Sequence, residues 1–159
     1  MTKEESVLYA GALSFAAKKH AGALRRNGMP YIYHPIRVAM HLAEAGYDIR
    51  YQIVGLFHDL LEDTDATVEE LSEFCDEEML KAVRLVTKEE GFIESEYIER
   101  ILNNPFAKAV KNADRIDNFR DLFVQDDEEF RERYIKNTEE FFVGKFSKEL
   151  DDLYYENVK

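Results

Sequence analysis

The residues best suited to do chemistry lie in one short segment, His58-Asp59-Leu60-Leu61-Glu62-Asp63. The segment follows an apolar run over residues 53–57, so its ionisable side chains come directly after a stretch with the composition of a core. On a continuous helix, residues four apart lie on the same side. His58 would therefore lie on one side with Glu62, and Asp59 would lie on one side with Asp63. Polar groups near a core cost free energy unless something binds them. We therefore expect a divalent metal held by His58 and Asp59, with Glu62 and Asp63 left for proton transfer.

Two further residues could complete a metal site. His34 precedes Pro35 at a helix start, and Asp114 lies inside an otherwise regular helical pattern. Two imidazoles and two carboxylates make a mixed nitrogen and oxygen ligand set, which suits Mn²⁺, Fe²⁺ or Zn²⁺ better than Ca²⁺ or Mg²⁺. Such an ion keeps a position for water and lowers the pKa of that water. Taken singly, each residue also has an ordinary structural explanation as a helix cap, a surface charge or part of a turn.

The composition limits the class of protein. The chain has 159 residues, of which 45% are hydrophobic and 34% charged, so it is long enough for one core and unlike a disordered chain. Its three Pro and seven Gly favour helices over a turn-rich β fold. The net charge is −12, and broad nucleic-acid binding needs a positive surface, so we expect no nucleic-acid partner. A small anionic substrate remains compatible with this charge if local cations hold it.

Two features bear on where the protein works. The single Cys75 excludes an internal disulfide and is typical of a reducing compartment. The residues after Met1 do not have the pattern of a signal peptide, and no apolar run approaches the length of a membrane span. We expect a soluble, cytoplasmic protein with no membrane partner.

The hydrophobic pattern predicts helices over most of the chain. Thr2 with Glu5 and Thr67 with Glu70 have the spacing of capping boxes. No segment has a convincing period of two, so we expect an all-α helical bundle of roughly eight to ten helices in a single domain, residues 1–159. The expected helices are residues 2–20, 35–45, 50–61, 67–74, 77–87, 94–102, 106–123, 127–142 and 147–155.

Three of these helices have a distinctive composition. The helix over residues 50–61 is apolar nearly all round and is therefore predicted to be central. The last two helices are acidic and carry Phe141, Phe142, Tyr154 and Tyr155. These aromatic side chains would either cover the bundle or form a contact with a second copy, and the sequence leaves the oligomeric state open.

Three sequence blocks occur in order along the chain. The first, residues 20–35, contains Pro-Tyr-Ile-Tyr-His-Pro, the second, residues 55–64, contains His-Asp-Leu-Leu-Glu-Asp-Thr, and the third is Val-Lys-Asn-Ala-Asp-Arg-Ile-Asp-Asn at residues 110–118. Together they resemble the hydrolase domain of RelA/SpoT-type proteins and their small stand-alone relatives, which belong to the HD phosphohydrolase superfamily. The resemblance covers roughly residues 5–125 and leaves residues 126–159 as C-terminal helices.

The resemblance implies an all-helical HD fold and one metal ion, typically Mn²⁺. The metal ligands that it implies are His34, His58, Asp59 and Asp114. It also implies the hydrolysis of guanosine tetraphosphate and pentaphosphate (ppGpp and pppGpp), the alarmones of the stringent response. In that reaction pyrophosphate leaves the ribose 3′ position and GDP or GTP remains.

The same resemblance assigns roles to residues around the metal. The catalytic residues, which orient or deprotonate the attacking water, would be Glu62 and Asp63. The substrate-binding residues would be Arg25, Arg26, Arg115 and Asn118. Arginine suits this role because its fork of N–H groups binds phosphate through two parallel hydrogen bonds. Arg115 could equally pair with a carboxylate of its own helix.

Two positions depart from the long alarmone enzymes, in which the third block often continues as His-Asn-Met-Arg-Thr. Here Asp117 takes the His position and Asp121 takes the Thr position, where it would bring negative charge near an anionic substrate. Alternative substrates are therefore an adenosine alarmone, NADPH or a nucleoside monophosphate. A non-catalytic nucleotide-binding module is a further alternative, although Glu62 and Asp63 argue against it, because a binding site needs no groups for proton transfer.

Overall fold

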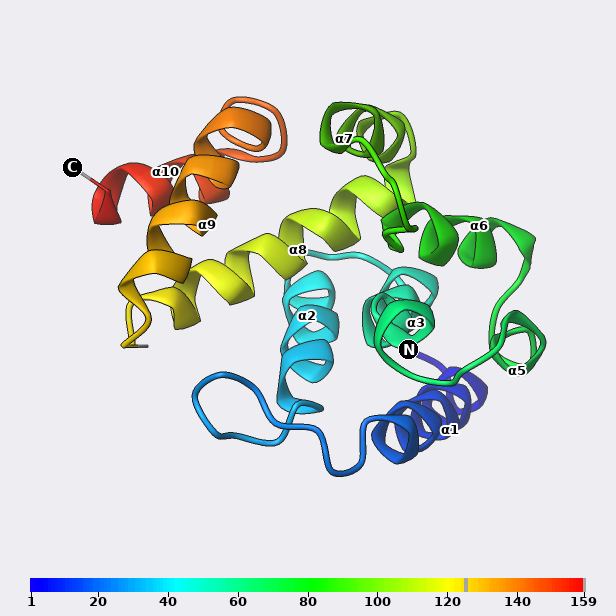
Figure 1. Cartoon of the computed structure of the whole chain (residues 1–159). Coiled ribbons are helices and arrows are strands. Elements are labelled where there is room, and N and C mark those ends of the chain that lie inside the picture. Colours follow the sequence, from blue (N-terminus) through cyan, green and yellow to red (C-terminus); the bar gives the residue numbers. More distant parts are fainter. Residues whose placement is uncertain (125, 159) are drawn as a thin grey trace.

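The computed structural model describes residues 1–124 and 126–158, and in these ranges the fold is all-α (Figure 1). The predicted all-α bundle of eight to ten helices is confirmed, since the described residues form ten helices. Outside them lies one isolated β-bridge between Leu24 and Pro30. The helices are α1 (Lys3–Lys19), α2 (Tyr33–Glu44), α3 (Ile49–Phe57), α4 (Leu60–Asp63), α5 (Val68–Leu71), α6 (Glu77–Val86), α7 (Glu94–Leu102), α8 (Pro105–Leu122), α9 (Glu128–Phe141) and α10 (Lys148–Asn157).

Helix α3 lies at the centre of the bundle. It contacts α1, α2, α6 and α8, and in Figure 1 the long α8 runs above α2 and α3. Gly55 allows α2 to pack closely against α3. A Cβ atom at this position would lie only 2.9 Å from Leu42 Cδ1 and 3.3 Å from Val38 Cγ1. Both of these side chains are buried. The close packing of α2 on α3 brings together the two helices that carry His34 and lead into His58.

The central helix expected over residues 50–61 is broken in the structure. Helix α3 ends at Phe57 and α4 begins at Leu60, with Asp59 at φ −117° and ψ 5°. The prediction of one continuous helix was wrong because the apolar pattern continues on both sides of the break. Adjacent residues on a regular helix point in different directions. The break instead brings His58 Nε2 to 3.7 Å from Asp59 Oδ2.

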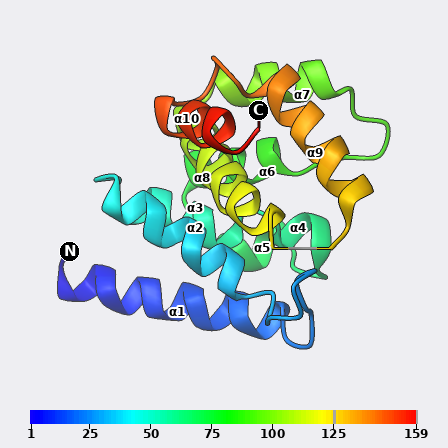
Figure 2. The same cartoon turned by 90° about the vertical axis from the view of Figure 1, so that its left-hand side faces the viewer.

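The C-terminal helices cover the bundle. Phe142 and Leu150 are fully buried in the main core, while Tyr154 joins Phe119 of α8 in a second, smaller cluster. Figure 2 shows α9 and α10 lying beside α8. Covering the bundle is one of the two roles expected for the aromatic side chains of the last two helices. None of the helices in residues 1–124 and 126–158 is long and apolar enough to cross a bilayer.

Candidate metal centre and adjoining pockets

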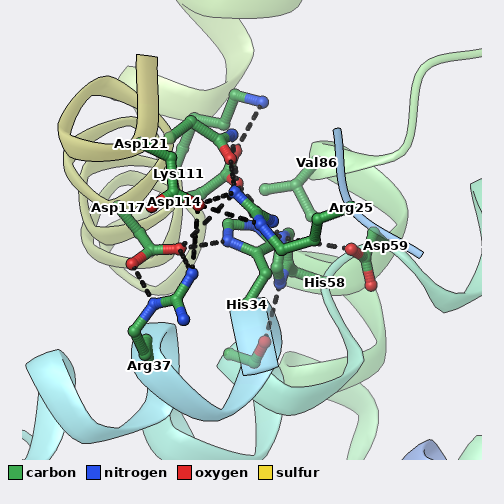
Figure 3. Close-up of polar contacts among 12 residues, drawn as sticks. Arg25, His34, Arg37, His58, Asp59, Val86, Lys111, Asp114, Asp117 and Asp121 are labelled. Atoms are coloured by element: carbon green, nitrogen blue, oxygen red, sulfur yellow. Dashed lines mark hydrogen bonds and ion pairs between the residues drawn. The ribbon is translucent and has the colours of Figure 1, made fainter. Parts of the chain in front are cut away.

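The predicted metal ligands meet where three parts of the fold converge. His34 comes from the first turn of α2, His58 and Asp59 from the break after α3, and Asp114 from the middle of α8. All four side chains are buried. His34 Nε2 lies 3.2 Å from His58 Nε2 and 2.8 Å from Asp114 Oδ1. Figure 3 shows these side chains meeting between the helices. Ligand atoms of His34, His58 and Asp59 all lie within 4.8 Å of one another, so the group could hold a metal ion.

The far nitrogens of both imidazoles are fixed by acceptors. His58 Nδ1 donates to the carbonyl oxygen of Gly55 at 2.7 Å, and His34 Nδ1 donates to Asp117 Oδ2 at 2.6 Å. A neutral histidine with its proton on Nδ1 presents a lone pair at Nε2. When both rings are neutral, as metal binding requires, two such lone pairs face each other beside the Asp114 carboxylate. A cation among these atoms relieves their repulsion, so the donor set fits a divalent metal.

The pKa values of this cluster agree with a site for positive charge. Burial lowers the pKa of His58, but the Asp59 and Asp114 carboxylates outweigh it and raise that pKa to about 9. Burial raises the pKa of Asp114, yet Lys111 and the two imidazoles together hold it well below its usual range. Asp59 behaves in the same way, with His58 as the main opposing influence. The two carboxylates therefore stay ionised inside the fold.

Two residues that were not predicted as site residues hold Asp59. Tyr31 donates its hydroxyl to Asp59 Oδ2 at 2.5 Å, and His20 Nε2 lies 3.2 Å from Asp59 Oδ1. His20 is 3% exposed, so the contact is shielded from water. Both residues belong to the first sequence block, which was the only signal that could have identified them.

Glu62 and Asp63 lie at the edge of a cavity of about 180 Å³ beside the metal ligands. Glu62 Oε1 accepts a hydrogen bond from the backbone N–H of Lys88 at 2.7 Å, which orients this carboxylate. Burial, followed by the charges of Asp59 and Glu62, raises the pKa of Asp63. A carboxylate of raised pKa is better suited to accept a proton near neutral pH.

Three cations line the same cavity, which we call the metal pocket. They are Lys88, Lys111 and Arg115. Lys111 Nζ donates to Asp114 Oδ2 at 3.1 Å. Lys88 is partly buried, and this burial lowers its pKa. Arg115 is 5% exposed, lies over the rings of Tyr134 and Phe142, and donates from Nη1 to Thr138. Its buried Nε has no hydrogen-bond partner among the described residues. The pocket therefore offers positive charge, and Arg115 also has a structural role.

A second cavity of about 220 Å³ adjoins the metal pocket and shares Tyr31, Asn118 and Tyr134 with it. We call it the aromatic pocket, because Phe130 and Tyr134 of α9 form part of its lining. Arg26 lies over the Phe130 ring with Cζ 3.7 Å from the ring centroid. A flat, polar ring could stack on an aromatic side chain of this pocket.

Arg25 and Asn118 connect the two pockets. Asn118 Nδ2 donates to Asp114 Oδ1 at 3.1 Å, and Asn118 Oδ1 accepts from Arg25 Nη2 at 3.0 Å. Arg25 also pairs with Asp121 at 2.9 Å. The Asp121 charge is thus balanced within the protein. Sequence reasoning had no means to find this pair, since the two residues are 96 positions apart.

Comparisons with known proteins identify the family of the chain. The family model described as the HD domain matches residues 12–143. The match covers well over half of the chain, so the chain belongs to the HD-domain family. The resemblance to RelA/SpoT-type hydrolase domains is likewise confirmed by the relatives that follow.

A guanosine-3′,5′-bis(diphosphate) 3′-pyrophosphohydrolase of Aquifex aeolicus is 38% identical over 140 residues, which are 83% of this chain and 20% of the relative. The human pyrophosphohydrolase MESH1 is 39% identical over 120 residues, 70% of this chain and 67% of that protein. A solved structure of a metazoan ortholog of SpoT, described as hydrolysing ppGpp, aligns at a TM-score of 0.77 and 28% identity, covering 94% of this chain and 92% of the other. The chain spans only 15–20% of the length of the first two curated relatives that it matches.

Proposed function

We propose that the protein hydrolyses guanosine tetraphosphate and pentaphosphate and releases pyrophosphate from the ribose 3′ position. The observation that carries the proposal is the meeting of His34 Nε2, His58 Nε2 and Asp114 Oδ1 beside a pocket lined with cations. The relatives named for this activity support the same substrate. We further propose that residues 1–159 act as one hydrolase domain, because α9 supplies part of the aromatic pocket.

The metal ligands proposed are His34, His58, Asp59 and Asp114. A divalent ion bound there, for which we propose Mn²⁺, supplies a water molecule of lowered pKa. In the overall reaction an oxygen atom of water joins the phosphorus next to O3′, the P–O3′ bond breaks, and O3′ takes up a proton. Glu62 and Asp63 are proposed to orient this water and to accept its proton.

The substrate is proposed to lie across both pockets. Its pyrophosphate would face Lys88, Lys111 and Arg115 in the metal pocket. Its base would stack in the aromatic pocket near Arg26, while Arg25 and Asn118 lie between the two. The negative charge of Asp121 counted against an anionic substrate at this position. Arg25 forms an ion pair with Asp121 and neutralises that charge.

The compartment proposed is the cytoplasm. The one cysteine, Cys75, is a free thiol that is buried. Burial raises the pKa of this thiol to about 12, so it remains protonated and unreactive at neutral pH.

The decisive experiment offers ppGpp to the Mn²⁺-loaded protein and measures GDP and pyrophosphate by chromatography. We expect both products in equal amounts, and we expect Asp59→Ala to abolish them. Asp65→Ala is the matched control, because Asp65 is an exposed carboxylate two residues after this segment and its ion pair with Lys19 lies at the surface. A panel with NADPH, an adenosine alarmone and nucleoside monophosphates is tested in parallel. Cleavage of one of these with ppGpp left intact would refute the substrate, and the absence of any affinity for Mn²⁺ would refute the metal site.

A further inference from the structure

Asp117 lies on the far side of the His34 imidazole from the proposed metal. Its Oδ2 atom is 2.6 Å from His34 Nδ1, whereas the Nε2 atom of the same ring faces His58 and Asp114. Asp117 is 9% exposed, so water does not compete freely for the contact. It therefore touches a proposed ligand without being placed to bind the ion itself.

A second residue fixes the Asp117 carboxylate in turn. Arg37 donates from Nε to Asp117 Oδ1 at 2.6 Å and from Nη2 to Asp117 Oδ2 at 3.2 Å (Figure 3). Two parallel hydrogen bonds from a guanidinium define the plane of a carboxylate as well as its position. Arg37 thus fixes the orientation of the Asp117 carboxylate that accepts from His34 Nδ1.

Helical spacing explains why these groups meet. His34 and Arg37 are three residues apart on α2, and Asp114 and Asp117 are three residues apart on α8. Residues at this spacing lie on the same face of a helix. When α2 packs on α8, the pair His34 and Arg37 faces the pair Asp114 and Asp117, so one helix contact builds both the ligand set and its support.

The network extends from Asp117 to the substrate side of the site. Arg37 Nη2 also donates to Asp121 Oδ2 at 3.2 Å, and Asp121 pairs with Arg25 at 2.9 Å. Arg25 Nη2 lies 3.9 Å from Asp117 Oδ2. Asp117, Arg37 and Asp121 therefore form a chain of alternating charge between the proposed ligand His34 and the proposed substrate contact Arg25.

We propose that Asp117, clamped by Arg37, is a positioning residue for His34. It holds the proton of the imidazole on Nδ1 and fixes the ring plane, so that the Nε2 lone pair points at the metal. Carboxylates that accept from a metal-ligating histidine in this way typically contribute a factor of roughly 10 to 100 in metal affinity. The inference rests on the metal site proposed above.

The test compares Asp117→Asn with Asp121→Asn. Asp121 is the matched control, because it lies one turn further along α8 and pairs with the same arginines but has no hydrogen bond to His34. Mn²⁺ affinity is measured by titration calorimetry on the full chain, and circular dichroism checks that each variant is folded. We expect a roughly 10- to 100-fold loss of affinity in Asp117→Asn and a change of less than about twofold in Asp121→Asn.

A spectroscopic readout separates positioning from a general structural effect. Nitrogen NMR of ¹⁵N-histidine-labelled, metal-free protein, recorded at a pH at which the ring is neutral, reports which ring nitrogen of His34 carries the proton. The proposal predicts Nδ1 in the wild type and in Asp121→Asn, and a shifted or mixed tautomer in Asp117→Asn. Equal Mn²⁺ affinity in Asp117→Asn and wild type, or an unchanged His34 tautomer, would overturn the inference. A wild type without Mn²⁺ affinity would instead refute the proposed function on which it rests.

Discussion

The two imidazoles at the centre of the molecule are prepared for a cation before one arrives. The Gly55 carbonyl and the Asp117 carboxylate accept hydrogen bonds from Nδ1 of His58 and His34, so that in the neutral rings both Nε2 lone pairs point into the same space. Organisation of this kind removes the cost of reorienting ligands when the ion binds. The sequence predicted the four proposed ligands, but it could not predict these acceptors. A backbone carbonyl belongs to every residue type, and Asp117 differed from the family pattern without any sign of its partner.

The substitution Glu62→Gln tests whether Glu62 serves proton transfer while His58 and Asp59 bind the metal. We expect Glu62→Gln to keep its Mn²⁺ affinity and to lower kcat by roughly 100-fold or more, because an amide cannot accept the proton of water. The amide oxygen can still accept from the backbone N–H of Lys88, so the local structure should persist. Calorimetry and steady-state kinetics on the same preparation measure the two quantities. If the variant lost its metal, Glu62 would be a ligand and the assignment would be wrong.

Asp63 links activity to stability through its charge. Folding raises the pKa of Asp63 above its usual value near 3.8, so the charged carboxylate opposes folding. This penalty is absent below pH 3.8, grows as the pH rises through the pKa of the folded state, and is fully present at neutral pH. Asp63→Asn should therefore raise the melting temperature of the chelator-treated protein at pH 7, with a difference that shrinks toward pH 4.

Melting curves of the wild type and Asp63→Asn at several pH values measure this effect. Turnover of ppGpp should fall in the same variant, because its carboxylate is proposed to take part in proton transfer. A variant that melts below the wild type at pH 7 would contradict the burial of an unfavourable charge at this position.

At the scale of elements, the sequence predicted most helix limits and missed the one irregularity that matters most. Capping boxes at Thr2 and Thr67 are present as expected, because they depend only on residues three apart. The break at His58 and Asp59 has no such local signal. It depends on what the two side chains and the Gly55 carbonyl contact after folding, so it could not be predicted from spacing alone.

The contact between α2 and α3 sets the separation of the two imidazoles. Gly55→Val would place methyl groups against Leu42 and Val38, where even a Cβ atom is crowded. We expect a loss of roughly 1–3 kcal/mol in the free energy of unfolding, measured by urea denaturation. Mn²⁺ affinity should fall as well, because His34 moves relative to His58.

Gly11→Val is the matched control for this experiment. Gly11 lies in α1, and a Cβ atom there meets only Cε1 of the partly buried Phe74, at 3.2 Å. The two substitutions have the same effect on intrinsic helix propensity, so any difference between them reports the packing. Equal losses of stability, with Mn²⁺ affinity retained in both variants, would show that the α2–α3 contact does not set the metal site.

For the whole molecule, the metal centre joins parts of the chain that are far apart in sequence. His34 and Asp114 are 80 positions apart, so the unfolded chain cannot present the complete ligand set. An ion that binds only the folded state stabilises it by about 2.7 kcal/mol at a free concentration 100 times its Kd. We expect Mn²⁺ to raise the melting temperature relative to chelator-treated protein.

The specificity of that stabilisation is checked with two variants. His58→Gln should lose the shift in melting temperature, whereas Asp65→Ala should keep it. A shift of the same size in His58→Gln would mean that Mn²⁺ acts on the acidic surface instead of the buried ligands.

The contrast between the acidic chain and its cationic pocket has a consequence for the rate of encounter with substrate. A net charge of −12 repels a polyanion such as ppGpp at long range, while Lys88 and Lys111 attract it only after it has entered the pocket. Salt screens distant charges more strongly than partly buried ones, with a screening length of about 8 Å at physiological ionic strength. Moderate salt should therefore speed association, and kcat/KM should pass through a maximum as ionic strength rises. An enzyme with this charge distribution would have its highest kcat/KM at moderate ionic strength and a lower value in dilute buffer.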